Sequence, residues 1–264
     1  MTKPFKADVL VVKLSGKALT ADKALDALFA ALAGSAASAE RTRVVLVHGG
    51  GVEVDALMRG LGRRIDRIVS PAEDMPVIAG ALAGTCSLKL RGAAQRAGLM
   101  PLGLCATDAG IGRVVPADPR LGRVGVIEPG DSAAKRCLQA LLDAGFTPVI
   151  SSVGMDAAGA LWNINADDAA VASAALLGAP LIFLSDVPGV LDANKHLFEQ
   201  LNEEQAETLI AEGVISGGMT VKVRAAFRAA AMTGKPVAAA SVFDPMLPNK
   251  LASGQLPGTT FTLE

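Results

Sequence analysis

The chain has 264 residues, of which 51% are apolar and 19% charged, and its formal net charge is −1. This length predicts one large α/β domain or two lobes that share a sheet. The near-neutral charge argues against nucleic-acid and membrane partners. No signal-peptide pattern opens the chain, and the longest apolar run is too short for a membrane span and is broken by Gly178 and Pro180. The three cysteines lack metal or redox spacing. We therefore expect a soluble, cytoplasmic protein.

The first predicted strand runs from Asp8 to Leu14 and ends in Lys13-Leu14-Ser15-Gly16-Lys17. A lysine there places a cation where the chain turns over the sheet edge, although an ordinary surface lysine gives the same pattern. A helix over 20–33 and an ordinary connection over 34–38 follow. A second buried strand, 44–47, then leads into His48 and three glycines.

The glycine loop, Gly49-Gly50-Gly51, is the strongest local signal, because helical spacing resumes directly after it. A strand, a turn without side chains and a helix N-terminus together favour an anion. Neither standard nucleotide-binding glycine motif is present, so the anion is bound in another way. A tight strand-to-helix turn without a ligand is the alternative.

Ser70-Pro71-Ala72-Glu73 predicts the start of a long helix that continues to Gln95, with Ser70 as its N-cap. Pro76 is placed to kink its second turn. Gly80 and Gly84, four residues apart, allow another helix to cross closely. This helix is therefore a candidate subunit interface, with packing inside the same chain as the alternative.

A strand is expected over 100–106, and short Val-containing runs over 107–129 predict antiparallel hairpins that could form a lid over the glycine loop. A helix over 131–144 and a strand over 147–152 follow. Asn163 and Asn165 then share one face of a short strand. Asp167 or Asp168 is expected to cap the Ala-rich helix after it, and this polar cluster is either functional or simple capping.

The strand 181–184 ends in a polar, glycine-bearing turn that begins with Ser185 and Asp186. A polar helix over 202–211 follows, and another opens at Gly217 with Lys222 in its first turns. A cation is unfavourable there by ~0.3–1 kcal/mol, so Lys222 needs an anion or solvent nearby. The last strands are 236–240 and 259–263, the final one a possible antiparallel edge.

These polar residues all follow predicted strands or open helices, and in a largely parallel sheet such positions meet at the carboxyl edge. Two lysines, backbone anion loops and a carboxylate suit phosphoryl transfer, which depends on positioning and charge neutralisation. No Ser/His/Asp triad or metal-ligand cluster competes.

Six motifs, in order, resemble the amino acid kinase family, and the resemblance extends from Val9 to the end of the chain. The motifs are Val12-Lys13-Leu14-Ser15-Gly16, Val47-His48-Gly49-Gly50-Gly51, Gly80-Ala81-Leu82-Ala83-Gly84, Asn163-Ile164-Asn165-Ala166-Asp167, Leu184-Ser185-Asp186-Val187-x-Gly189-Val190 and Gly218-Met219-x-Val221-Lys222.

The resemblance implies an α/β fold: an open αβα sandwich with a mainly parallel central sheet and two lobes. It implies an acceptor-binding and dimerising lobe over 1–177 and an ATP-binding lobe over 178–264. The implied reaction is ATP-dependent phosphorylation of the side-chain carboxylate of N-acetyl-L-glutamate, in arginine biosynthesis. Mg²⁺ would be held mainly by phosphates and water, with no metal-ligating residue.

The resemblance also implies residue roles. Lys13 and Lys222 neutralise the transferring phosphoryl group, and Asp167 holds both lysines. Gly49 and Gly50 line the phosphate and acceptor site, while Asn163 contacts the acceptor. The nucleotide-binding positions carry over to Gly16, Asp186, Val187, Pro188, Gly189, Val190, Leu191, Val214, Ile215 and Ser216.

Two positions depart from the family pattern. Ser15 stands where glycine is usual, although a serine still offers its N–H. The acceptor-anchoring Gly-Leu-Arg-Val-Thr is replaced here by Asp66-Arg67-Ile68-Val69-Ser70, which shifts the arginine by one residue. In an extended segment that shift reverses the face. Three explanations are open: a bulge returns Arg67 to the acceptor site, Arg63 or Arg64 anchors the acceptor in its place, or the acceptor is a different molecule. We favour Arg67.

The resemblance further implies a homodimer joined through the helix over 70–95. Arginine-inhibited hexameric relatives carry an extra N-terminal helix that this sequence does not show, so we expect insensitivity to arginine. One rival is a sister kinase that acts on another carboxylate or on carbamate. Another is a non-catalytic regulator that binds a nucleotide or effector on the same fold.

Overall fold

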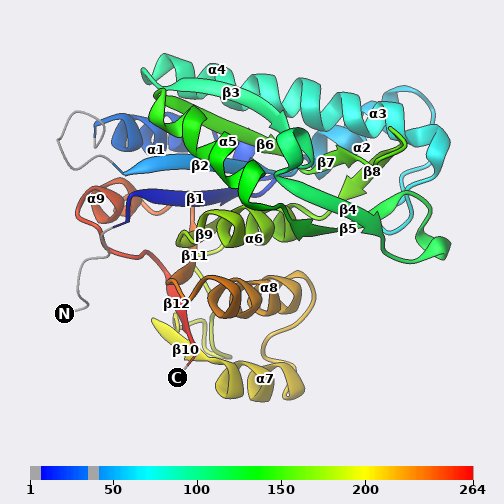
Figure 1. Ribbon diagram of the computed structural model, residues 1–264. Helices are drawn as coiled ribbons and strands as arrows, with labels where there is room; N and C mark the ends of the chain where they lie inside the picture. The colour runs from blue at the N-terminus through cyan, green and yellow to red at the C-terminus, as the bar shows by residue number, and fades with distance from the viewer. Residues whose placement is uncertain (1–6, 35–41, 264) are drawn as a thin grey trace.

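The computed structural model describes residues 7–34 and 42–263. The connection expected after Gly34 lies outside these residues. Helices cover both faces of a central sheet (Figure 1). In spatial order its strands are β10 (Gln200–Asn202), β12 (Thr259–Thr262), β11 (Val237–Ser241), β9 (Leu181–Ser185), β1 (Val9–Leu14), β2 (Arg43–His48), β6 (Phe146–Ser151) and β3 (Met100–Cys105).

Every neighbouring pair from β11 to β3 is parallel. β12 runs antiparallel to β11, as the sequence predicts, but it is not the edge strand, because β10 pairs with its other side. Side chains of β1 alternate between two apolar clusters: Leu10, Val12 and Leu14 face one, and Val11 faces the other. The α/β sandwich with a mainly parallel sheet is therefore confirmed.

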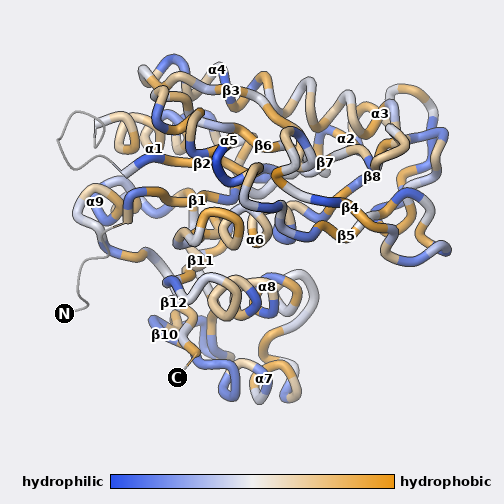
Figure 2. Tube along the Cα trace, viewed as in Figure 1, coloured by the Kyte–Doolittle hydropathy of each residue, from blue (hydrophilic) through white to orange (hydrophobic). Residues whose placement is uncertain are grey.

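The two sheet faces are covered by different helices. One apolar cluster includes residues of α1 (Asp22–Gly34), α4 (Ser87–Arg96) and α9 (Leu247–Ala252). The other includes residues of α5 (Ser132–Asp143), α6 (Ala166–Leu177), α7 (Glu203–Ala211) and α8 (Gly218–Thr233). Figure 2 shows hydrophobic residues along the central strands and hydrophilic ones on the outer loops.

A second, four-stranded sheet contains the predicted hairpin. Its strands are, in spatial order, β4 (Gly112–Pro116), β5 (Val124–Pro129), β8 (Leu161–Ile164) and β7 (Val153–Met155). β4 and β5 pair antiparallel, and β5 pairs parallel with β8. The hairpin lies at the same end of the molecule as α2 (Gly51–Gly60) and α3 (Met75–Ala79) (Figure 1). A lid function for it stays a prediction.

The helix predicted from Ser70 to Gln95 is not one continuous α-helix. A 3-10 turn, Ala72–Asp74, leads into α3, and a π-helical segment, Gly80–Cys86, joins α3 to α4. Pro76 lies in the first turn of α3, where a missing N–H is harmless, rather than in a second turn. Ser70 caps nothing, because its hydroxyl accepts a hydrogen bond from the Asn163 amide instead.

The predicted boundary between lobes at residues 177 and 178 does not divide the sheet. β1 and β9 lie on opposite sides of that boundary and pair over four residues, from Val11 with Leu181 to Leu14 with Leu184. The core is therefore continuous across it, and the division into two functional lobes stays a prediction.

Candidate active site at the carboxyl edge of the sheet

Four adjacent parallel strands end side by side. Leu14 in β1 pairs with His48 in β2 and with Leu184 in β9, and Ser185 in β9 pairs with Ser241 in β11. Polar residues at these ends therefore meet at one edge of the sheet, where open α/β sheets bind ligands.

A buried ion pair lies at this edge. Lys13 Nζ is 2.5 Å from Asp167 Oδ1, and the two side chains are 10% and 12% exposed. Asp167 lies in the first turn of α6, but the expectation that Asp167 or Asp168 caps this helix is wrong. Asn165 is the N-cap, and its Oδ1 accepts a hydrogen bond from the Asp167 N–H at 2.8 Å. Asp168 pairs with Arg228 instead, so the Asp167 carboxylate is left for Lys13.

Lys222 reaches the same place from α8. Its Nζ donates to Ser185 Oγ at 2.9 Å. Burial lowers the pKa of Lys222, and the charge of Lys13 lowers it further, whereas Asp167 and Asp186 oppose the shift. Lys13, Asp167 and Lys222, which lie far apart in the sequence, are thus brought together as the motifs predict, and the anion that Lys222 needs is supplied.

Within the glycine loop, Gly50 packs too closely for a side chain. A Cβ on Gly50 would overlap Cys86 Sγ in the π-helical segment and lie 2.9 Å from Leu82 Cδ2. A Cβ on Gly16 would lie 3.3 Å from the Gly51 nitrogen, so the loop after β1 touches the loop after β2. Gly50 is also the N-cap of α2, and this helix start has no side-chain cap. The backbone N–H groups there suit an anion.

His48 is a residue of this edge to which the sequence reasoning assigned no role. Its ring is fully buried; Nδ1 lies 2.9 Å from the Gly49 carbonyl oxygen and Nε2 lies 3.3 Å from Ser151 Oγ. Burial lowers its pKa to about 4, the hydrogen bond to Gly49 opposes this, and the charge of Arg91 adds to it. A neutral ring that donates from Nδ1 therefore fixes the first glycine carbonyl. Its position between a buried strand and the glycine loop was the available signal.

The acceptor side is built on a long-range contact. Asn163 Nδ2 donates to Ser70 Oγ at 3.0 Å, and Ser70 also exchanges backbone hydrogen bonds with Leu121 and Arg123 next to the hairpin. Ser70 is buried, so the amide of Asn163 is held from one side. Sequence reasoning named Asn163 but missed Ser70, which it assigned to helix capping.

The predicted acceptor arginine is engaged elsewhere. Arg67 is 73% exposed, and its Nε donates to Asp55 Oδ2 at 3.1 Å. The premise of an extended segment is wrong, because Asp66 Oδ1 accepts the N–H groups of Ile68 and Val69 and turns the chain there. A one-residue shift therefore does not simply reverse the face.

The neighbouring arginines differ in their partners. Arg63 pairs with Asp74. Arg64 forms no ion pair with any described residue, and it lines a cavity of about 300 Å³ between α2 and α3. Asp55 and Ile78 line the same cavity. Arg64 thus differs from Arg63 and Arg67, each of which is held in an ion pair.

The predicted nucleotide-binding stretches lie beside β9 and before α8. Asp186 and Pro188 are exposed, Val187 and Leu191 are half-buried, and Gly189 has a φ of +149° that favours glycine. Val190 is held by its N–H, which donates to Thr259 Oγ1 at 2.9 Å. The second stretch is Val214, half-buried; Ile215, buried; and Ser216, exposed.

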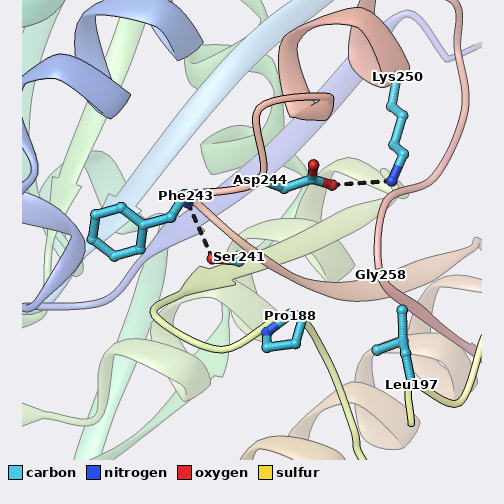
Figure 3. Close-up of a pocket in the computed structure, with 7 residues that line it drawn as sticks. All are labelled: Pro188, Leu197, Ser241, Phe243, Asp244, Lys250 and Gly258. Carbon is cyan, nitrogen blue, oxygen red and sulfur yellow. Dashed lines mark hydrogen bonds and ion pairs between the residues drawn. The ribbon is translucent and has the colours of Figure 1, made fainter.

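A cavity of about 320 Å³ opens next to Pro188 (Figure 3). Asp244 and Lys250 form an ion pair at 3.0 Å on its wall, and the Phe243 N–H donates to Ser241 Oγ at 3.0 Å. Ser241, at the carboxyl end of β11, lines this cavity, and it pairs with Ser185 at the end of β9. Val214, Ile215 and Ser216 do not line this cavity.

Over residues 7–34 and 42–263, no group of three or more His, Cys, Asp or Glu side chains gathers as a metal site. No helix in the same ranges is long and apolar enough to cross a membrane.

Comparison with known proteins identifies the family of the chain. The model of the amino acid kinase family matches residues 8–240. Acetylglutamate kinase of Vibrio vulnificus is 46% identical over 265 residues, with 99% of both chains covered. That of Aeromonas salmonicida is 46% identical over 258 residues, covering 96% of this chain and 98% of the relative.

Solved structures show the same fold. N-acetylglutamate synthase of Neisseria gonorrhoeae has a TM-score of 0.81 at 21% identity, covering 97% of this chain and 60% of that one. Giardia carbamate kinase has a TM-score of 0.70 at 17% identity, covering 98% and 99%. The chain belongs to the amino acid kinase family. Within that family it belongs with the acetylglutamate kinases, as its motifs predict.

Proposed function

We propose that this protein is an ATP-dependent kinase that phosphorylates the side-chain carboxylate of N-acetyl-L-glutamate to an acyl phosphate, a step of arginine biosynthesis. The observation that carries the proposal is the convergence of Lys13 and Lys222 around Asp167 at the carboxyl edge of the sheet. The acetylglutamate kinases at 45–46% identity supply the acceptor.

In the proposed reaction, an acceptor carboxylate oxygen attacks the γ-phosphorus. The bond from that phosphorus to the β,γ-bridging oxygen breaks, and ADP leaves with the electron pair; no proton is transferred. Two unit charges of the same sign ~4 Å apart repel by about 4 kcal/mol at an effective dielectric near 20. Lys13 and Lys222 offset this repulsion, most strongly as charge develops on the equatorial oxygens. Asp167 positions Lys13.

In this proposal each lobe binds one of the two substrates. Residues 1–177 bind the acceptor, through Gly49, Gly50 and Asn163, and dimerise. Residues 178–264, with Gly16, bind ATP along Asp186–Leu191 and Val214–Ser216. Mg²⁺ enters with the nucleotide, held mainly by its phosphates and by water.

The homodimer is joined through the segment over 70–95, and the proposed location is the cytoplasm. Leu88 in α4 and Met100 at the start of β3 are large exposed apolar residues on or next to this segment, which supports an interface there.

The arginine that anchors the acceptor is the open point of the proposal. We retain Arg67 as the first candidate, because its segment leads into Ser70, which holds Asn163. Arg64 is the second, because Arg67 is already paired with Asp55. Separate Arg63→Ala, Arg64→Ala and Arg67→Ala variants identify the anchor as the one whose loss raises the KM for the acceptor about tenfold and leaves the KM for ATP unchanged.

Turnover with purified protein tests the function. ADP release and acyl phosphate formation are measured with N-acetylglutamate, glutamate, aspartate, N-acetylaminoadipate and carbamate. Lys222→Ala is expected to lower kcat by roughly 10²-fold or more, and Lys23→Ala, an exposed lysine of α1, serves as the control. Unchanged turnover in a folded Lys222→Ala variant removes this lysine from the mechanism.

A sister kinase with another acceptor is the second candidate, favoured by the altered arginine segment alone. Preference for any other acceptor in the same assay would establish it. A non-catalytic regulator is disfavoured because Lys13, Asp167 and Lys222 are all present and assembled. ATP binding without turnover on any acceptor would revive that candidate.

A further inference from the structure

Lys17 is a third lysine at this edge, and the motifs assign it no role. Its Nζ lies 2.7 Å from Asp186 Oδ2, across 169 residues of sequence. Lys17 directly follows Gly16, which touches the glycine loop, and Asp186 directly follows β9. Since β1 and β9 are neighbouring parallel strands, this ion pair connects the loops that follow them at the carboxyl edge of the sheet.

The charges around this pair are shared with the two other lysines. The pKa of Asp186 is lowered first by its hydrogen bond from Lys17, and the charge of Lys222 lowers it as well. The charge of Lys13 lowers the pKa of Lys222, and that of Asp167 raises it. The cluster thus holds positive charges on Lys13, Lys17 and Lys222 against negative charges on Asp167 and Asp186. It carries a net positive charge where a polyphosphate would bring several negative ones.

Lys17 also differs from the other two lysines in its freedom to move. Its side chain is 70% exposed and that of Asp186 is 37% exposed, whereas Lys13 is buried against Asp167. An exposed ion pair contributes little to stability and exchanges partners readily. A lysine on a flexible stem binds phosphate as a point charge.

We propose that Lys17 is an additional nucleotide-binding residue, whose ammonium leaves Asp186 to bind phosphate oxygens of a nucleoside triphosphate. This inference rests on the proposed kinase function, because it takes ATP as the ligand of this edge. The ammonium group acts on the polyphosphate chain and not on the base or the ribose. The affinity it adds therefore grows with the number of phosphates.

Isothermal titration of ATP, ADP and AMP into the wild type and Lys17→Gln tests this, with Mg²⁺ present. Lys17→Gln is expected to weaken ATP binding roughly 5- to 10-fold, ADP less and AMP hardly at all. Lys17→Arg keeps the charge and retains most of the affinity. Lys23→Gln, which removes an exposed lysine from α1, is the matched control. The salt dependence of ATP binding should be shallower in Lys17→Gln, because one charge contact is lost.

The same titrations separate the possible failures. Equal weakening of ATP and AMP would mean that Lys17 only supports the Asp186 loop, and unchanged ATP affinity would mean that it binds no phosphate; either result overturns the inference. The KM for N-acetylglutamate and the melting temperature should both stay at wild-type values. A wild type that neither binds nor turns over ATP overturns the kinase proposal itself, which is a different result from an active wild type with an indifferent Lys17→Gln.

Discussion

Replacing Gly50 by alanine tests how the glycine loop is held against the π-helical segment. The added Cβ would overlap Cys86 Sγ and lie 2.9 Å from Leu82 Cδ2. Leu82 Cδ2 is the end of a flexible side chain and can turn away, but the Cys86 sulfur is on a short side chain that is fully buried. Relieving the overlap therefore requires a backbone shift in the loop or in the segment.

Overpacking of this kind costs about 1–3 kcal/mol. We expect Gly50→Ala to lower the free energy of unfolding by that amount, seen in urea titrations as a lower midpoint at an unchanged slope. Gly51→Ala is the control, because a Cβ there would meet no atom within 4 Å. It adds the same methyl group at the next position, the first residue of α2, and should leave stability unchanged or slightly raised.

A second-site change makes the test decisive. Cys86→Ala alone removes a buried sulfur and should destabilise the protein by roughly 1 kcal/mol. In the Gly50→Ala background the same change removes the overlap, so the two effects should be non-additive by about 1 kcal/mol or more. Strictly additive free energies would mean that Gly50 and Cys86 do not touch, and the described packing of the loop would be refuted.

Three further predictions concern other parts of the site. The pKa of His48 is lowered to about 4, below the 6.5 of a histidine in the unfolded chain. Between these pH values the unfolded chain therefore binds more protons than the folded protein. The stability that the neutral ring contributes is fully present above pH 6.5 and is lost as the pH falls towards 4. Urea titrations should show a loss over that interval up to about 3 kcal/mol larger in the wild type than in His48→Gln, whereas parallel profiles would contradict the shift. Ser70→Ala should raise the KM for the acceptor about tenfold with that for ATP unchanged, and Ser70→Thr should not, because its hydroxyl still accepts from Asn163. Lys13→Met should destabilise the fold by about 3–5 kcal/mol by leaving Asp167 buried without its cation, and adding Asp167→Asn should recover part of this; no recovery would argue against the pair.

Local patterns predicted most of the strands and the edge at which they meet. The apolar runs of β1, β2 and β9 are buried in the structure as they are read from the sequence. Because parallel strands end at the same edge, Lys13 and Ser185 could be placed near each other without coordinates. The predicted convergence of Lys222 follows from the same rule, since the helix that carries it begins at that edge with Lys222 in its first turns.

Features set by distant contacts could not be predicted. Ser70 reads as a helix cap because three local signals agree, but Asn163, 93 residues away, takes its hydroxyl. The turn around Asp66 is set by a local contact instead: its carboxylate accepts the N–H groups of Ile68 and Val69, which the spacing of apolar residues does not reveal. The pairing of Lys17 with Asp186 depends on two loops meeting, and neither loop carries a signal of it.

The cap of α6 is Asn165 and not Asp167, two residues further on, and this difference has a chemical consequence. A capping carboxylate folds back onto the N–H groups of its own helix, and Asp167 in that role would be turned away from Lys13. Asn165 takes the cap instead, and its neutral amide satisfies the N–H of Asp167. The carboxylate then stays in the first turn, where the helix dipole favours a negative charge and offsets part of the cost of burial. The asparagine therefore allows a single buried acid to pair with Lys13 while its charge still acts on Lys222.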